Sequence, residues 1–139
     1  MYGIRGMVAM ASTAQDRRWT LPEIAKETNA PEAFMGKIMQ QLVKARLVSS
    51  VKGHGGGFAL AASSRKRLTL ADVVRVIDGD ALFQGCALGF DKCDDRRPCP
   101  IHVQMIAIRH HLSVGLSRTR IEALGEQLAQ GELFMRTKR

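Results

Sequence analysis

The feature that most constrains the fold of this 139-residue chain is a glycine-rich run, Lys52-Gly-His-Gly-Gly-Gly57. It lies between two short segments of β-prone residues, 47–51 and 58–60. Glycine adopts backbone conformations that other residues avoid, so a run of this kind favours a tight turn. Two β-prone segments joined by a short glycine-containing turn predict a β-hairpin.

Three segments with helical spacing precede this hairpin. The first is expected over residues 2–14, where apolar residues recur every three or four positions. The second is expected over residues 20–28, because Thr20 and Glu23 form a capping box at its start. The third is expected over residues 31–45, with proline in its first turn.

The third helix is predicted to have two unlike faces. Its apolar stripe, expected to be buried, comprises Phe34, Met35, Ile38, Met39 and Leu42. Its opposite face is small, polar or basic and has no acid; it comprises Ala33, Gly36, Lys37, Gln40 and Lys44. Residues 1–67 contain 11 Lys/Arg against 4 Asp/Glu, whereas residues 68–139 contain 10 against 9. This concentration of positive charge points to nucleic acid or another anionic surface, with a merely solvated basic face as the alternative.

Three helices followed by a β-hairpin is the order of a winged helix-turn-helix, a mainly α fold with a small hairpin. In that motif the third helix enters the major groove of DNA, and the hairpin wing lies beside it near the phosphates. We therefore predict that residues 1–67 bind double-stranded DNA. The predicted contact residues are Ala33, Gly36, Lys37, Gln40, Lys44, Lys52 and His54.

Enzymatic explanations of the glycine-rich run fit less well. The sequence His54-Gly-Gly-Gly57 matches the oxyanion loop of lipases, but that fold also needs a G-x-S-x-G motif, which is absent. A phosphate-binding loop would end in Gly-Lys-Ser/Thr, whereas this run ends in Gly-Phe. No acid–base pair or nucleophile constellation stands out elsewhere, so we predict that the protein is not an enzyme.

Further helices are expected beyond the hairpin. A capping box at Thr69 predicts a helix over residues 69–77, and Pro100 is expected to begin a long helix that Gly115 ends. A last helix is expected over residues 117–130, followed by a frayed tail from Phe134 to Arg139. Apolar residues of the last two helices are predicted to form a two-fold homodimer interface, the alternative being that these helices pack on their own domain. The predicted interface residues are Ile101, Met105, Ile108, Leu112, Ile121, Leu124 and Leu128.

The chain is thus expected to have three regions. Residues 1–67 form the DNA-binding region, and residues 68–99 form a linking helix and a cysteine-bearing sensor loop. Residues 100–139 form the dimerisation helices and the tail. No apolar run is long enough to span a membrane, and the start lacks the pattern of a signal peptide. We therefore expect a cytoplasmic protein, in which thiols stay reduced.

All three cysteines lie in one polar loop. Six residues separate Cys86 from Cys93, five separate Cys93 from Cys99, and His102 follows three positions later. Three thiolates and an imidazole form a four-ligand set, and thiolates select zinc, copper(I) or iron–sulfur clusters. A redox-reactive thiol cluster, or cysteines without a role, is the metal-free alternative. A small zinc-finger-like RNA-binding site is a further one, although Phe90 is the one aromatic between the ligands that could stack on a base.

Four stretches of the chain match one family. They are Tyr2-Gly-Ile-Arg5, the run Leu47-Val-Ser-Ser-Val-Lys-Gly-His-Gly-Gly-Gly-Phe58, the helix Leu70-Ala-Asp-Val-Val74, and the three cysteines before a long helix. In these stretches the chain resembles the IscR/NsrR-type (Rrf) family of bacterial winged-helix transcriptional regulators. The resemblance implies a homodimer that binds a palindromic DNA operator, with an affinity set in many members by an iron–sulfur cluster on the cysteines.

The resemblance also bears on the fourth ligand. In the nitric-oxide-sensing branch this ligand is an acid just before the tyrosine, where this chain has Met1. The cysteine-regulator branch has a histidine three residues past the last cysteine, where His102 stands. The three cysteines and His102 are therefore expected to hold a [2Fe-2S] or [4Fe-4S] cluster, with zinc as the alternative. The family's wing arginine is Lys52 here, which keeps the charge but lacks the planar fork of arginine.

Overall fold

The computed structural model describes residues 1–135, so the expected tail lies outside the described residues from position 136 onward. The protein is mainly helical with one two-stranded hairpin, as the sequence predicts. In chain order the elements are α1 (Tyr2–Ala11), α2 (Leu21–Thr28), α3 (Glu32–Lys44), β1 (Val48–Val51), β2 (Gly57–Leu60), α4 (Leu70–Asp78), α5 (Ala81–Gln84), α6 (His102–Arg118) and α7 (Ile121–Ala129).

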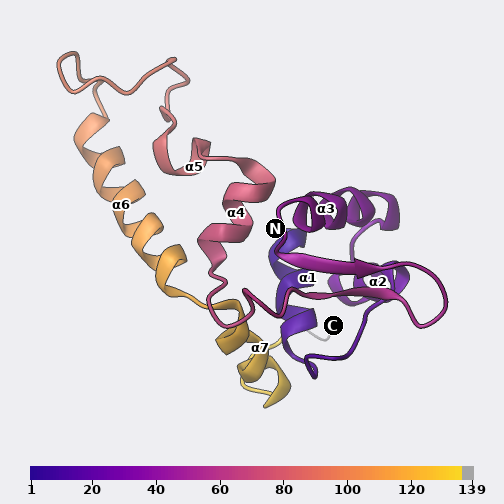
Figure 1. Ribbon diagram of the computed structural model, residues 1–139. Coiled ribbons are helices and arrows are strands. Elements are labelled where there is room, and N and C mark those ends of the chain that lie inside the picture. Colours follow the sequence, from indigo (N-terminus) through magenta and orange to yellow (C-terminus); the bar gives the residue numbers. More distant parts are fainter. Residues whose placement is uncertain (136–139) are drawn as a thin grey trace.

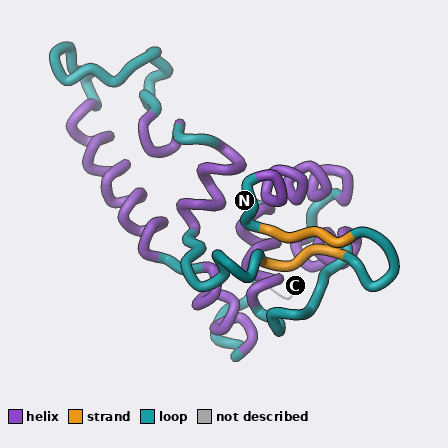
Figure 2. The backbone as a smooth tube through the Cα atoms, viewed as in Figure 1, coloured by secondary structure: helices purple, strands orange, loops and turns teal. Residues whose placement is uncertain are grey.

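The molecule has a body and an arm. Helices α1, α2 and α3, the hairpin and α7 form the body, and α6 extends away from it (Figure 1). The long loop that joins α5 to α6 lies at the far end of this arm (Figure 2). None of the helices in residues 1–135 is both long and apolar enough to cross a membrane.

Helix α1 lies at the centre of the body. It packs against α2, α3, α4 and α7, and its Met7 and Met10 side chains are buried. Met35 and Met39 of α3 and Ile24 of α2 meet them in one apolar core. Burying each such side chain stabilises the fold by about 1.5–3 kcal/mol, so this cluster fixes the mutual placement of the helices.

The helix-turn-helix of α2 and α3 is set by local signals. The predicted capping box is present: Thr20 N–H donates to Glu23 Oε2 at 2.7 Å, and Glu23 N–H donates to Thr20 Oγ1 at 3.4 Å. Asn29 ends α2 in the left-handed conformation, with φ of 53°. Pro31 then stands at the N-cap of α3. A second predicted capping box, between Thr69 and Asp72, starts α4.

The predicted hairpin pairs in antiparallel register from Val48 with Leu60 to Val51 with Gly57. The wing is widened by Trp19, whose backbone exchanges hydrogen bonds of 2.8 and 2.7 Å with Phe58. Gly57 has φ of 134°, and a Cβ atom there would lie 2.5 Å from the Trp19 carbonyl oxygen. Glycine is therefore required where the hairpin meets this extended segment.

Two sequence-based predictions about the N-terminal helices are wrong in detail. The first helix ends at Ala11 rather than near residue 14, because the hydroxyl groups of Ser12 and Thr13 donate to the carbonyl oxygens of Ala9 and Met10 and so cap the end of the helix. Phe34 is 51% exposed rather than part of the buried stripe, and its ring packs edge-on against Tyr2. The other four members of the stripe are buried.

The boundary between the last two helices is also predicted wrongly. Helix α6 begins at His102, two residues after Pro100, and continues through Gly115 to Arg118. A glycine inside a helix costs only about 1 kcal/mol relative to alanine, so it does not by itself end one. Ser117 lies within α6 and does not cap the next helix, and Arg120 occupies the N-cap of α7. The short helix α5 was not expected, because its four residues carry no periodic pattern.

Helix α7 packs back on its own domain. Ile121 is fully buried in the core of the single chain, and Leu124 and Leu128 pack against that core. Gly125 lies so close to Ala11 that a Cβ atom there would be 2.5 Å from the Ala11 backbone. These three apolar residues of α7 are therefore not an open surface for a partner, contrary to the interface predicted from the sequence.

A buried arginine joins α7 to α1. Arg65 donates to the carbonyl oxygens of Ala11 and Thr13, each at 3.0 Å, and its Nε lies 3.3 Å from Glu122 Oε1. These bonds satisfy carbonyl groups at the end of α1 that have no helical partner. Two backbone hydrogen bonds, from Leu70 N–H to the Thr119 carbonyl and from Ile121 N–H to the Leu68 carbonyl, join the start of α4 to the start of α7.

Candidate functional site

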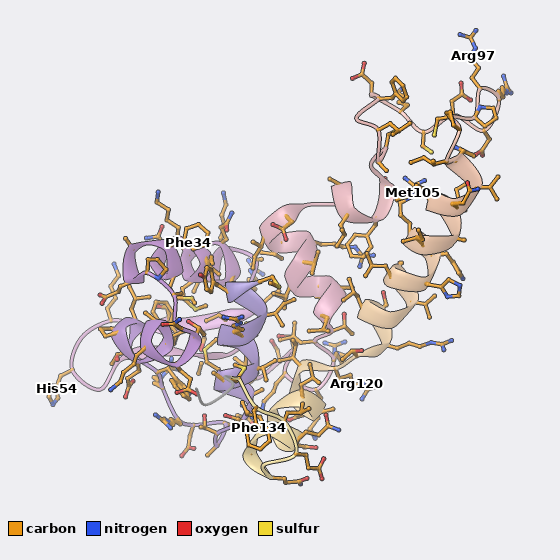
Figure 3. The ribbon with its side chains drawn as sticks, turned by 180° about the vertical axis from the view of Figure 1, so that it is seen from behind. Phe34, His54, Arg97, Met105, Arg120 and Phe134 are labelled. Atoms are coloured by element: carbon orange, nitrogen blue, oxygen red, sulfur yellow. The ribbon has the colours of Figure 1, made fainter. Side chains whose placement is uncertain are left out.

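The structure exposes the predicted DNA-contacting face of α3. Ala33, Lys37, Gln40 and Lys44 are exposed, and Gly36 is half-buried where α3 approaches Leu21 of α2. Lys52 and His54 are exposed on the wing. His54 lies at the wing tip, at the opposite end of the molecule from the cysteine loop (Figure 3).

One exposed cation was missed by the sequence analysis. Arg46 lies between α3 and the wing, with φ of 61°. Its positive charge, two residues after Lys44, could have indicated a DNA contact. It was not predicted because it lies beyond the end of the helical pattern of α3. Together with Lys44 and Lys52 it extends the positive charge from the helix to the hairpin.

The loop between α5 and α6 forms a thiol-lined pocket with a volume of about 390 Å³. All four predicted ligands line it, although they come from a segment of 17 residues. Its walls are Cys86, Phe90, Lys92, Cys93, Asp94, Arg97, Cys99, Pro100 and His102. The three cysteines are free thiols and are half-buried. The structure thus brings the predicted donor set into one place.

His102 is held in a defined orientation at the start of α6. Its ring is buried, Nε2 lies 2.8 Å from Asp95 Oδ1, and Nδ1 lies 3.2 Å from Cys93 Sγ. An ionised carboxylate can only accept a hydrogen bond, so Nε2 carries the proton. In the neutral ring Nδ1 then presents its lone pair to Cys93 and the pocket. A carboxylate that orients a histidine in this way is the usual outer partner of a metal-ligating histidine.

Hydrogen bonds and a nearby positive charge act on two of the sulfur atoms, those of Cys86 and Cys93. Backbone N–H groups of Phe90 and Leu88 donate to Cys86 and lower the pKa of its thiol, with smaller contributions from Gly89 and the Arg109 charge, against an opposing effect of burial. Arg109 of α6 also donates from Nη2 to Cys93 Sγ over 3.3 Å. The bonds to Cys86 favour its thiolate, the form that binds metals.

The donor set fits a thiolate-bound group by chemistry and by place. In residues 1–135 no three of the His, Cys, Asp and Glu side chains already converge on a single metal position. The pocket belongs to a loop whose own hydrogen bonds are short turns, such as Gly89 to Cys86 and Arg97 to Asp94. The thiols would therefore have to move toward one another to hold a metal or cluster.

The predicted interface residues of α6 differ in exposure. Ile108 is 55% exposed, whereas Ile101, Met105 and Leu112 are half-buried. Val103, at 73%, and Ile106, at 44%, are also exposed, although neither was predicted. Helix α6 packs against α4 and α5, and Figure 1 shows its other sides uncovered.

Comparison with known proteins places these features in a family. The Rrf2 family, described as an iron-dependent transcriptional regulator, matches residues 1–127. A protein of Aquifex aeolicus assigned as an HTH-type transcriptional regulator is 31% identical over 122 residues, covering 85% of this chain and 84% of that protein. An rrf2-like HTH-type regulator of Rhodobacter capsulatus is 29% identical over 112 residues, covering 72% of this chain and 71% of the relative.

Solved structures show the same fold. CymR, the global cysteine regulator of B. subtilis, superposes with a TM-score of 0.69 at 25% identity, covering 94% of this chain and 92% of that one. IscR of T. potens superposes with a TM-score of 0.72 at 21% identity, covering 96% and 87% of the two chains. The winged-helix fold predicted from the sequence is confirmed.

Substitutions on α3 and the wing are expected to separate phosphate contacts from base contacts. Lys37→Ala and Lys52→Ala should each weaken DNA binding and lower the slope of log affinity against log salt by about one per lost phosphate contact. Gln40→Ala should change sequence preference more than non-specific affinity, because glutamine can pair with adenine through two hydrogen bonds. Titration of selected and random duplexes at several salt concentrations measures both effects.

Arg120→Ala is the matched control for these variants. Arg120 is an exposed cation next to α7, away from α3 and the wing (Figure 3), so its removal should leave the salt slope unchanged. If the two lysine variants and the glutamine variant bind every duplex as the parent does, the DNA-binding face is assigned wrongly.

Proposed function

The chain belongs to the Rrf2 family of transcriptional regulators, and from that premise we propose a homodimeric regulator whose operator affinity is set by an iron–sulfur cluster in the thiol-lined pocket. Transcription regulation through a DNA-binding winged helix is common to the family and its structural neighbours. The cluster, the dimer, the palindromic operator and the sensing of redox state, nitric oxide or cluster supply are the parts we add. The cytoplasm, where thiols stay reduced, is the compartment that this chemistry needs.

The observation that most supports the cluster is the arrangement at His102. Asp95 holds one ring nitrogen and leaves the other directed at Cys93, in the pocket that Cys86 and Cys99 also line. The family description as iron-dependent agrees with a thiolate-rich iron site. A bound cluster would supply redox and nitric-oxide sensitivity, and the chain's own residues would transmit its state.

The transmission follows from the place of the loop. Residues 85–101 connect α5 to α6, and both helices belong to the arm that adjoins α4. Closing four donors on one group orders this loop, and that order affects DNA binding only if it favours one placement of α3. Such couplings are typically about 1–3 kcal/mol, or about 5–150-fold in affinity.

The dimer is supported by α6. Residues two positions apart lie on opposite sides of a helix, so Ile106 and Ile108 face different ways. Ile106 lines the groove between α5 and α6 together with Phe83, and Ile108 therefore faces away from it. Helix α6 extends from the body (Figure 1) and carries exposed apolar side chains. A second copy of this chain would cover them.

Thiol chemistry without a metal is a second candidate for the pocket. It is favoured by the lowered pKa of the Cys86 thiol and by the three unpaired cysteines. Zinc on the same four ligands is a third form of the site. The colour and metal content of the protein distinguish them: an iron–sulfur protein is brown and contains iron and sulfide, whereas the zinc and metal-free forms are colourless.

Cysteine variants test the cluster directly. In protein purified without oxygen, Cys86→Ala, Cys93→Ala and Cys99→Ala should each abolish the visible absorption and the bound iron and sulfide, because each removes a thiolate ligand. His102→Ala should lose less, since water, a buffer thiol or a carboxylate such as Asp94 or Asp95 can take the fourth place. Absorption spectra with iron and sulfide analysis measure the loss.

His110→Ala is the matched control for the histidine variant. His110 is exposed on the same helix, one of the residues along the α5–α6 groove rather than the pocket, and its variant should keep the parental spectrum. If the parent protein is colourless after anaerobic purification and contains zinc or no metal, the iron–sulfur assignment is wrong. The pocket is then a zinc site or a metal-free thiol site.

The dimer is tested by a charge on α6. Ile108→Asp would place an unpaired carboxylate in an apolar seam, which costs several kcal/mol, and should give monomers or insoluble protein. Gln127→Asp, at an exposed position of α7, is the control and should leave the dimer intact. Light scattering after size-exclusion chromatography measures the mass. A well-behaved dimer of the Ile108→Asp variant would contradict the interface.

A further inference from the structure

Arg109 lies at the junction of the thiol-lined pocket and the α5–α6 groove. We propose that Arg109 is a positioning residue that holds the cysteine loop on α6 and links Cys93 to the end of α5. The proposal rests on the proposed function for its role in regulation, but the holding of the loop is a property of the protein without metal.

The Arg109 side chain makes three hydrogen bonds that together hold the loop. Nη1 of Arg109 donates to the carbonyl oxygens of Gln84, at 3.2 Å, and of Gly85. Nη2 donates to Cys93 Sγ at 3.3 Å. A single guanidinium therefore joins α6 both to the root of the loop and to its middle. The side chain is half-buried in the groove that Phe83 and Ile106 also line.

Few other side chains attach this loop to α6. Within residues 1–135, the side-chain hydrogen bonds from α6 to residues 84–101 come from Arg109 and His102. His102 contacts Cys93 and Asp95, eight and ten residues further along than Gly85, so it does not hold the loop root. Loss of the Arg109 bonds therefore frees the root, while His102 still holds the second half of the loop.

The root of the loop is connected in turn to the DNA-binding body. Arg75 of α4 pairs with Asp80 over 3.3 Å and stacks on Phe83 of α5 at 4.7 Å. On the other side of α4, Ile77 meets Gly3 of α1 next to Ile38 of α3. Contacts thus continue from Cys93 through Arg109, α5 and α4 to α3, the helix that we assign to the DNA groove.

The geometry explains why an arginine stands at this position. The guanidinium is a planar fork that donates in several directions at once, and it stays charged at any pH of interest. Lysine has one compact donor group on a flexible stem, so it can bond to the carbonyl oxygens or to the sulfur but does not hold both in fixed positions. Because the donors do not yet converge on one metal position, binding of a metal or cluster by Cys93 would move its sulfur, and Arg109 would either follow it and move the end of α5 or release it.

The first test uses the metal-free protein. In Arg109→Ala, backbone amides of residues 84–93 should exchange with deuterium on the order of tenfold faster, because three hydrogen bonds from a charged donor are lost. Arg109→Lys should restore this protection only in part. Arg118→Ala removes an exposed arginine from the same helix and should leave the exchange of the loop unchanged. Mass spectrometry of proteolytic peptides resolves the segment.

The second test compares loaded and metal-free protein. Arg109→Ala should retain metal-free DNA affinity within about twofold, but should reduce the ratio of affinities between the two forms. It should also lower the reduction potential of the bound cluster, because a hydrogen bond to a ligand sulfur raises that potential. A residue that merely stabilised the fold would change neither quantity in correctly folded protein.

The outcomes separate this proposal from the proposed function. Unchanged exchange in Arg109→Ala, or full protection in Arg109→Lys, would overturn the positioning role whatever the pocket binds. Arg109→Ala could show faster exchange but the same ratio of loaded to metal-free DNA affinity as the parent. Arg109 would then hold the loop only, and its link to the DNA-binding body would be overturned. A parent protein with equal affinities in both forms would overturn the proposed function, while the exchange experiment would still decide whether Arg109 holds the loop.

Discussion

The close packing of α1 against four other helices is the interaction on which the rest of the structure depends. Met7 and Met10 are buried in the core that also contains Ile24 of α2 and Met35 of α3, and Ala11 lies against Gly125 of α7. With α1 held in this way, the apolar side of α3 is buried and its basic side is left to solvent. Arg65 closes the end of α1 and fixes α7, so the chain that leaves the body as α4 returns to it after α6.

This return explains the shape of the arm. Residues 70–118 leave the body and come back to it at almost the same place, since the starts of α4 and α7 are bonded to each other. The arm is held to the body at this place and along α4, which packs on α1 and α3, and the thiol-lined pocket lies at its far end (Figure 3). A change in that pocket reaches the body along α4 or through a partner that packs on α6. The charge pattern fits this division, because the excess of positive charge belongs to residues 1–67.

The sequence predicted what depends on local chemistry. Capping boxes at Thr20 and Thr69 and the glycine-rich turn mark their elements because a few neighbouring residues suffice to form them. The donor set of three cysteines and His102 was predicted from its spacing, and the structure places all four residues around one pocket. That they hold an iron–sulfur cluster stays a prediction.

Features that depend on distant contacts were not predicted. The role of α7 is decided by the fit of Gly125 against Ala11, and the end of α6 by the pairing of Thr119 with Leu70, neither of which a helical pattern shows. Phe34 fits the apolar period of α3 but packs on Tyr2 at the surface. Arg109 and Asp95 were missed for the same reason, since each acts on a residue several positions away along a loop.

The central claim is that the state of the thiol-lined pocket sets DNA affinity, and operator binding by the two forms of one preparation tests it most directly. Iron-loaded and metal-free protein would be titrated with the same operator, and with random DNA, at one fixed salt concentration. Operator affinities of the two forms are expected to differ by about 5–150-fold. Equal affinities on every DNA would contradict it and would mean that the pocket is not the switch, whatever it binds.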